Sequence, residues 1–375
     1  MAPVPIQVTS SSAVIAAPAR VEYGAGRAVL WSEAPHGGRV ELRGLLPGTR
    51  YVVRIRGVSR SFRTPPAAAL TTRVGVHGAI LLNGSPFLPV MQWLQCPTLF
   101  APNVALGINV FLGRGCDGES DAEEVADLRA AGAYSVLPYD ASVASAPSLF
   151  GWRHDDEPDQ KRTPPEKLAH PRDARHVTFL TLTSRFADGD PALYRRYVAR
   201  ADVVGFDLYP VTGYCRPDWL PRVYDLQKRL VDLAGRKPTY QWIEAISTAS
   251  QFCTGRGVAA AELRAEAWLS IVGGAKAVGY FTHSWKPTYS QFRVAPDVQS
   301  AMRRTNGELS AYAPAILAKP VDVSANVPAI ARRFNGATYV FALNEKRDGV
   351  AARVQVGSRT LARTLPPLGV WIQRL

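Results

Sequence analysis

Eight short apolar runs that each end in polar residues alternate with helix-like segments, and this alternation constrains the fold more than any other feature of the chain. The runs are Phe87–Gln95, Leu106–Leu112, Tyr134–Tyr139, Leu149–His154, Val177–Thr183, Val203–Tyr209, Thr239–Glu244 and Ala277–His283. Strands that alternate with helices are typical of a parallel sheet, and eight repeats are enough to close that sheet. We therefore predict an α/β fold whose centre is a (β/α)8 TIM barrel over residues 72–318.

The segments between these runs carry apolar residues three and four positions apart, the period of a helix with one buried face. They are Asp121–Ala131, Pro191–Arg200, Leu220–Ala234, Ala259–Gly273 and Val298–Tyr312. Residues 160–173 are polar and rich in proline, so a helix is least expected there. Before the barrel, Asn83-Gly84 lies between two apolar stretches, which predicts a hairpin.

Two flanking regions contain β-prone runs without helical spacing. Residues 1–68 hold short runs broken by Gly and Pro, and Pro65-Pro66 begins a plausible linker. After Val321, four strand-like runs follow one another: Ala329–Phe334, Ala337–Leu343, Ala351–Val356 and Gly369–Gln373. We predict a β-sandwich over residues 1–68 and a small antiparallel β-sandwich over residues 320–375.

The net charge of +13 is carried mainly by the flanking regions, because residues 1–70 contribute +6 and residues 320–375 contribute +5. A nucleic-acid-binding protein would show a basic stripe with interleaved aromatic residues, and the central region has none. The basic surplus is either a solvated surface or an attraction to an anionic polymer such as a cell envelope. No apolar run is long enough to span a membrane.

Each of the four cysteines follows a predicted barrel strand: the first, second, sixth and seventh. Adjacent strands bring adjacent loops together, so the disulfides Cys96–Cys116 and Cys215–Cys253 are expected, with buried free thiols as the alternative. Disulfides would imply a secreted or cell-envelope protein, although the N-terminus shows no signal peptide.

The fourth run leads directly into three acids, Asp155-Asp156-Glu157. Adjacent carboxylates repel one another, so at least one of them should have a raised pKa, as a general acid requires at neutral pH. The alternative is an acidic loop that binds solvent or a cation.

The seventh run is aromatic and apolar, and it ends in a single carboxylate, Glu244. An ionised glutamate at such a depth costs several kcal/mol unless it has a partner, so a buried salt bridge is the structural alternative. Because all strand C-terminal ends of a barrel open on one face, we expect Glu157 and Glu244 to meet in one cleft.

These two positions resemble those of the clan A glycoside hydrolases, retaining (β/α)8-barrel enzymes whose acid/base glutamate ends strand four and whose nucleophilic glutamate ends strand seven. The resemblance implies that Glu244 attacks the anomeric carbon and that Glu157 protonates the leaving oxygen before activating water. One departure is that Asp156 stands where many clan members have an asparagine.

Other side chains near the predicted strand ends are assigned to substrate binding. They are Trp152, His154, Asp156, Asp207, Tyr209, Gln241, Trp242, His283 and Trp285. By resemblance to the clan, Tyr209 holds the nucleophile and Trp285 forms the floor of a sugar subsite. For Trp93, core packing is preferred. No cofactor is implied, and no set of His or Cys residues with metal-ligand spacing is visible.

Leu45-Leu46-Pro47-Gly48-Thr49-Arg50-Tyr51 and the strand after it resemble the end of a fibronectin type III-like domain. The resemblance implies that the hydroxyl of Tyr51 bonds back to the chain at a corner of the sandwich.

Three alternatives to a retaining glycosidase stay open. One is an inverting glycosidase with Asp207 or Asp140 as its base. A second is a carbohydrate- or cell-wall-binding protein on a barrel without activity. A third, an esterase using Ser284 and His283, is disfavoured because neighbouring residues of a strand point to opposite faces.

Overall fold

The computed structural model describes residues 5–9, 12–25, 31–43, 45, 49–65, 69–169, 171, 173–248, 252–253 and 255–375. It divides into two compact units, Met1–Ala69 and Leu70–Leu375, so the barrel and the C-terminal strands share one unit. The predicted boundaries at residues 68, 72, 318 and 320 stay predictions. Pro66, Ala67, Ala68, Leu46, Pro47 and Gly48 lie outside the described residues.

The N-terminal unit contains two antiparallel sheets, ordered β1-β2-β5 and β4-β3-β6-β7. Its strands are β1 (Pro5–Val8), β2 (Ser12–Ala16), β3 (Val21–Ala25), β4 (Trp31–Glu33), β5 (Arg39–Arg43), β6 (Arg50–Ile55) and β7 (Val58–Arg63). Alternate residues of β6, Tyr51, Val53 and Ile55, enter the core because strand side chains alternate between faces. The ring of Tyr51 stacks on Phe62 with centroids 5.8 Å apart, and the corner bond of its hydroxyl stays a prediction.

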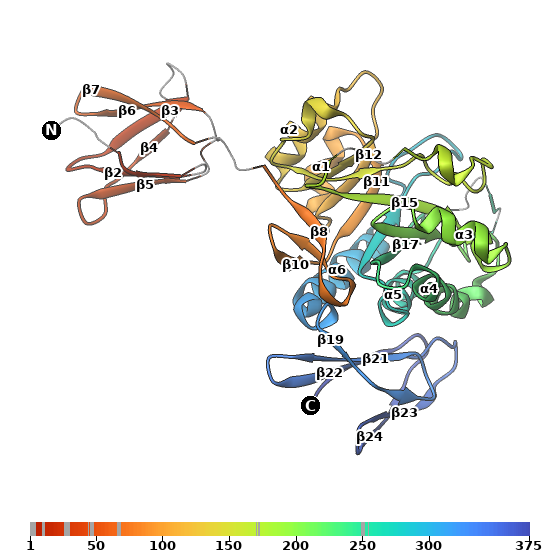
Figure 1. The fold of residues 1–375 in the computed structure, drawn as a ribbon. Helices are drawn as coiled ribbons and strands as arrows, with labels where there is room; N and C mark the ends of the chain where they lie inside the picture. Colours follow the sequence, from red (N-terminus) through yellow and green to blue (C-terminus); the bar gives the residue numbers. More distant parts are fainter. Residues whose placement is uncertain are drawn as a thin grey trace. The chain divides into compact units, whose positions relative to one another are not determined.

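Eight parallel strands form a closed barrel in chain order, as predicted (Figure 1). They are β11 (Val90–Gln95), β12 (Val110–Arg114), β13 (Tyr134–Leu137), β14 (Leu149–Arg153), β15 (Val177–Thr183), β16 (Val203–Asp207), β17 (Thr239–Glu244) and β18 (Ala277–Phe281). Inward side chains such as Met91, Phe150, Phe179 and Tyr240 fill its interior. The barrel is therefore a packed core whose open face carries the side chains at the strand ends.

Figure 1 shows the helices outside the ring of strands. They are α1 (Phe100–Val104), α2 (Asp121–Ala131), α3 (Pro191–Val198), α4 (Leu220–Ala234), α5 (Ala260–Val272) and α6 (Pro296–Ile316). The segments after β13 and β14 contain only the short 3-10 turns η3 (Ala141–Val143) and η4 (Pro165–Lys167). Within the described part of the chain, none of the helices has both the length and the apolar character needed to cross a bilayer.

A small sheet, β8 (Thr72–Val74), β9 (Ile80–Leu82) and β10 (Ser85–Phe87), precedes the barrel, and Asn83-Gly84 forms its predicted hairpin turn. The C-terminal strands form two antiparallel sheets, β19-β21-β22-β25 and β20-β23-β24, as predicted. Their bounds are β19 (Lys319–Val321), β20 (Ser324–Ala325), β21 (Ala329–Phe334), β22 (Ala337–Leu343), β23 (Val350–Val356), β24 (Arg359–Leu365) and β25 (Val370–Arg374).

One buried acid on α2 gives the first testable prediction. Burial, and next the charge of Glu119, raise the pKa of Glu124 from 4.5 to about 9. The folded chain then holds a proton that the unfolded chain releases above pH 4.5, so the free energy of unfolding falls as the pH rises toward 9. We expect Glu124→Gln to flatten this fall and to be the more stable protein at pH 8. Urea unfolding across that pH window measures the effect, and Asp232→Asn, an exposed change on α4, should leave the slope unchanged.

Candidate active site

A cavity of about 210 Å³ opens among the C-terminal ends of the barrel strands. Ten residues line it: Trp93, Asp156, Glu157, Thr181, Asp207, Tyr209, Trp242, Phe252, Phe281 and Trp285. An adjoining hollow of about 300 Å³ shares Glu157, Asp207, Tyr209 and Phe252 with it. Glu157 and Asp207 therefore lie where the two hollows meet.

Three carboxyl groups share this cavity, those of Asp156, Glu157 and Asp207. Burial, and next the charge of Glu157, raise the pKa of Asp156 to about 6. Burial, followed by the charge of Glu157 and a hydrogen bond with it, raises the pKa of Asp207 well above its ordinary value. The shift favours the protonated form of Asp207 beside Glu157, an arrangement in which one carboxyl group can hold a proton and its neighbour can accept one.

The backbone of Glu157 is in the left-handed region, with φ of 47°, which is uncommon for a residue with a side chain. Its carbonyl oxygen accepts bonds from the amides of Gln160 and Lys161, and its Oε2 accepts a bond of 2.9 Å from the side-chain amide of Gln160. The turn that follows β14 therefore holds Glu157 in a strained conformation. Strain of this kind concentrates at functional sites.

A largely buried cation lies close to the acids. Arg153, the last residue of β14, has its guanidinium 5.7 Å from the ring centroid of Trp93. Burial lowers its pKa, while the charges of Asp156 and Asp155 act in the opposite direction. Burial raises the pKa of Asp156, and the charges of Arg153 and Lys161 both act against that rise.

An aromatic wall adjoins the carboxyl groups. The ring of Phe281 stacks on Tyr209 with centroids 5.2 Å apart and on Trp285 with centroids 6.3 Å apart. Trp285 is 49% exposed and Phe252 is 65% exposed, although both line the cavity. Exposed aromatic faces beside a polar cleft offer a surface for the apolar faces of a ligand, since their own burial is incomplete.

Glu244 is not among the residues that line this cavity, although its charge and that of Glu157 both act on Tyr209, which does line it; that Glu244 and Glu157 meet in one cleft stays a prediction. Its side chain is fully buried. Its carboxylate accepts bonds from the amide of Val211 (2.7 Å), the amide of Thr212 (2.6 Å) and the hydroxyl of Thr212 (2.5 Å). The loop after β16 thus encloses this carboxylate, and a catalytic role for Glu244 stays a prediction.

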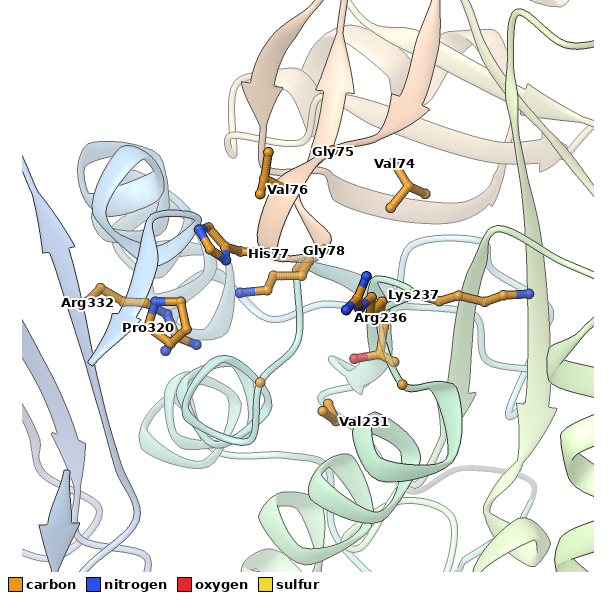
Figure 2. A pocket seen from close by; sticks show the side chains of 14 residues that line it. Val74, Gly75, Val76, His77, Gly78, Val231, Arg236, Lys237, Pro320 and Arg332 are labelled. Atoms are coloured by element: carbon orange, nitrogen blue, oxygen red, sulfur yellow. The ribbon is translucent and has the colours of Figure 1, made fainter. Parts of the chain in front are cut away.

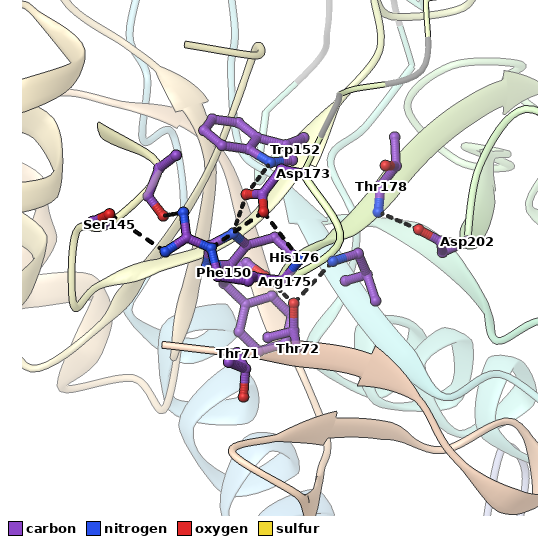
Figure 3. A network of polar contacts seen from close by, with 12 residues as sticks. Thr71, Thr72, Ser145, Phe150, Trp152, Asp173, Arg175, His176, Thr178 and Asp202 are labelled. Atoms are coloured by element: carbon purple, nitrogen blue, oxygen red, sulfur yellow. Dashed lines mark hydrogen bonds and ion pairs between the residues drawn. The ribbon is translucent and has the colours of Figure 1, made fainter. Parts of the chain in front are cut away.

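Trp152, which the sequence assigns to substrate binding, does not line the cavity. Its side chain is fully buried, and its indole nitrogen donates a bond of 3.0 Å to Oδ2 of Asp173 (Figure 3). The same oxygen lies 2.5 Å from Nδ1 of His176, and these bonds lower the pKa of Asp173 to about 2. Trp152 belongs to a buried polar network beside β14 and is no part of the cavity wall.

Three further predicted binding residues are not among those that line the cavity. Gln241 lies between the inward-facing Tyr240 and Trp242, so it points outward and accepts a bond of 3.0 Å from Ser270 on α5. The ring of His154 lies 2.9 Å from the carbonyl of Arg200. The ring of His283 lies 2.8 Å from the carbonyl of Leu94, and burial lowers its pKa.

The remaining predicted residues do gather at the cavity: Glu157, Asp156, Asp207, Tyr209, Trp242 and Trp285. Four lining residues were not predicted: Trp93, Thr181, Phe252 and Phe281. Strand alternation could have found Thr181, because it shares the inward face of β15 with Phe179. The preference for core packing of Trp93 is half right, since its ring packs edge-on against Trp242 at 5.4 Å while also lining the cavity.

Asp140 and Ser284, the alternative catalytic residues, form hydrogen bonds with residues near them in the chain. The carboxylate of Asp140 accepts bonds of 2.8 Å from the amide and the hydroxyl of Ser142, and it does not line the cavity. The hydroxyl of Ser284 donates to the carbonyl of Lys286 at 2.9 Å. Among the described residues, no group of three His, Cys, Asp or Glu side chains is arranged to hold a metal ion.

Both predicted disulfides are confirmed, and they stabilise loops at the open end of the barrel. Cys96–Cys116 links the loops after β11 and β12, with Cα atoms 5.1 Å apart. Cys215–Cys253 links the loops after β16 and β17, with Cα atoms 5.5 Å apart. The second bond holds Phe252, the neighbour of Cys253, at the cavity that Asp207 also lines.

No protein-family model matches this chain, and no curated protein matches it. A solved structure described as a glycoside hydrolase has a TM-score of 0.50 at 11% identity, over 81% of this chain and 93% of that one. The Ruminococcus gnavus beta-glucuronidase is more distant, with a TM-score of 0.45 at 10% identity, over 82% of this chain and 67% of that one. The endo-beta-1,4-mannanase from Thermotoga petrophila has a TM-score of 0.42 at 10% identity, over 77% and 91%. The first of these shows that a glycoside hydrolase has a similar fold, and nothing further follows from the other two.

Proposed function

We propose that this chain is a glycoside hydrolase that cleaves a polysaccharide or oligosaccharide in the cavity at the C-terminal end of its barrel. The observation that carries the proposal is that Asp207 and Glu157, two carboxyl groups joined by a hydrogen bond, line one cavity that has an exposed aromatic wall. Hydrolysis of a glycosidic bond needs one carboxyl group that gives a proton and a second that is ionised.

In the proposed mechanism, Asp207 gives its proton to the leaving glycosidic oxygen while the carboxylate of Glu157 takes a proton from the attacking water. This is a single displacement at the anomeric carbon, which inverts its configuration. The two carboxyl groups of an inverting enzyme lie roughly 6.5–9.5 Å apart, so a sugar and a water must separate the hydrogen-bonded pair on binding. Asp156 and Arg153 set the charge around the pair.

The competing scheme is the double displacement that clan A resemblance implies, with Glu244 as the nucleophile. It requires the loop at Val211 and Thr212 to release a carboxylate that now accepts three hydrogen bonds. Proton NMR of the first product separates the two schemes, because only the double displacement retains the anomeric configuration.

The deciding experiment is a panel of glycans and aryl glycosides, tested on the wild type, Glu157→Gln, Asp207→Asn and Glu244→Gln. We expect turnover of at least one substrate, with an inverted product, and loss of turnover in the first two variants. A retained product together with a fluoroglycoside adduct on Glu244 would replace this mechanism by the double displacement.

A carbohydrate-binding protein without activity is the second candidate, because the exposed rings of Trp285 and Phe252 would serve binding alone. Binding of a glycan by the wild type without turnover of any panel member would favour it.

The disulfides and the flanking regions bear on where the chain functions. Because both disulfides form between loops, we propose that the chain functions in an oxidising compartment outside the cytoplasm. We also propose that residues 1–68 are a fibronectin type III-like module and that the basic flanks attract an anionic cell-envelope polymer.

Trp285 gives a prediction for substrate binding. Its ring is half exposed at the cavity, so its loss should remove stacking with a sugar and leave the carboxyl groups in place. We expect Trp285→Ala to raise KM about tenfold, equivalent to about 1.4 kcal/mol, with kcat within about threefold. Steady-state kinetics on the best panel substrate measure this. Tyr139→Ala is the control, since Tyr139 is 46% exposed but does not line the cavity.

A further inference from the structure

A second, larger cavity lies at the opposite end of the barrel. Its volume is about 770 Å³, and it reaches Thr239, the first residue of β17, and Lys276, which directly precedes β18. The other walls are the loop between β8 and β9, the end of α4, and Pro320 and Arg332 of the C-terminal strands (Figure 2). All these elements belong to the unit Leu70–Leu375.

The lining of this cavity is basic and contains no acidic residue. Lysines 237 and 276, arginines 236 and 332, and one histidine contribute to it. Figure 2 shows the side chain of Lys237 pointing away, and its ammonium donates to the carbonyls of Val198 (2.7 Å) and Ala201 (2.6 Å). Lys276, Arg236 and Arg332 are therefore the cations available to an occupant.

Lys276 is the most informative of these cations. It is only 8% exposed, and among the described residues no hydrogen bond or ion pair is made by its ammonium group. Burial, and then the charge of Arg332, lower its pKa to about 7. Its charged form is therefore disfavoured in the protein alone, and an anion in the cavity would stabilise that form.

Arg332 has a similar position on β21. Its Nε donates to the carbonyl of Ile316 at 3.2 Å and one terminal nitrogen donates to the carbonyl of Ala331 at 3.2 Å. Neither partner carries charge, and burial lowers the pKa of the guanidinium. Two guanidinium groups and one ammonium group thus face a common space without a carboxylate in its wall.

We propose that this cavity binds a small ligand that carries a phosphate group, with Lys276, Arg332 and Arg236 as its anchors. Guanidinium groups bind phosphate through two parallel hydrogen bonds, and three cations match an anion of more than one negative charge better than a single carboxylate. The volume exceeds what a bare ion needs and falls in the range of small-molecule sites, so the phosphate is expected as part of a larger molecule. This proposal is independent of the glycosidase activity.

The test uses the full chain and two probes, inorganic phosphate and pyrophosphate, with ionic strength held constant by sodium chloride. We expect saturable binding of the wild type by calorimetry and a rise in Tm, with pyrophosphate the stronger ligand. Lys276→Met should weaken binding at least tenfold, yet raise the Tm measured without phosphate, because it removes a charge that burial disfavours.

Lys319→Gln is the matched control, because it removes one exposed positive charge next to Pro320 and does not line the cavity. Its affinity should equal that of the wild type. Arg236→Gln changes an exposed loop and keeps the test valid if Lys276→Met does not fold. The proposal is overturned if the wild type shows no saturable binding, or if Lys276→Met or Arg236→Gln binds as tightly as Lys319→Gln.

Discussion

Replacing Asp207 with asparagine is expected to lower kcat by about 10²–10⁴-fold, with little change in KM. The side chain keeps its shape and its place beside Glu157, but it can no longer give a proton to a leaving oxygen. Because the proposed role is proton transfer alone, binding of the same substrate should persist in Asp207→Asn. Steady-state kinetics and equilibrium binding of the intact substrate to the variant measure the two effects.

Asp207→Asn should also raise the free energy of unfolding, whereas a substitution that only disrupts the fold would lower it. The pKa of Asp207 is raised in the folded chain, mainly by burial, so stability falls as the pH rises above the ordinary value of an aspartic acid. The asparagine does not titrate, so Asp207→Asn should be the more stable protein at pH 8. A variant that is inactive and more stable is expected only where a group is held in a costly environment for its chemistry.

Asp155→Asn is the matched control for this prediction. Asp155 is an exposed acid in the same turn as Glu157, and it does not line the cavity. Its kcat should stay within about twofold of the wild type, because surface substitutions away from a site have small effects. Full activity in Asp207→Asn would remove Asp207 from the mechanism. Equal losses in the two variants would point to the net charge of the loop instead.

Periodicity alone predicts much of this fold. Val177–Thr183 and Thr239–Glu244 match β15 and β17 to the residue, because each is a buried apolar run with polar residues at its end. The first predicted strand, Phe87–Gln95, instead divides into the end of β10 and β11. Pro89 lies between the two, and proline cannot donate to a sheet ladder. Prediction fails where a single residue interrupts a regular pattern.

The site is predictable at the level of strand ends and not at the level of side-chain direction. Asp207 and Glu244 both end a barrel strand, yet only Asp207 lines the cavity. The difference arises from residues 211 and 212, whose amides follow β16 and reach across to the end of β17. Nothing in the sequence near Glu244 shows that a loop from the neighbouring strand satisfies its carboxylate. Which strand-end carboxyl group lines the cavity therefore depends on side-chain contacts between distant segments, and residue spacing does not reveal these contacts.

Glu244→Gln is expected to act on stability far more than on the chemical step. In the folded chain the carboxylate of Glu244 accepts bonds from two amides and one hydroxyl. Burial, and next the charge of Glu244, raise the pKa of the neighbouring Glu266 well above its ordinary value. The glutamine amide would turn an N–H group toward one of these N–H donors. We expect a loss of about 2–3 kcal/mol in the free energy of unfolding, the cost of leaving buried donors unsatisfied.

Thr212→Val provides the matched comparison, because it removes one hydroxyl donor to Glu244 and keeps both amide bonds. Its loss should be smaller, about 1 kcal/mol. Urea unfolding of both variants gives the stabilities, and kcat of folded Glu244→Gln should stay within about tenfold of the wild type, in contrast to the loss of about 10⁴-fold or more typical of a removed nucleophile. A Glu244→Gln protein of normal stability whose activity is lost, and returns with azide, would show that the loop opens to let Glu244 attack the substrate.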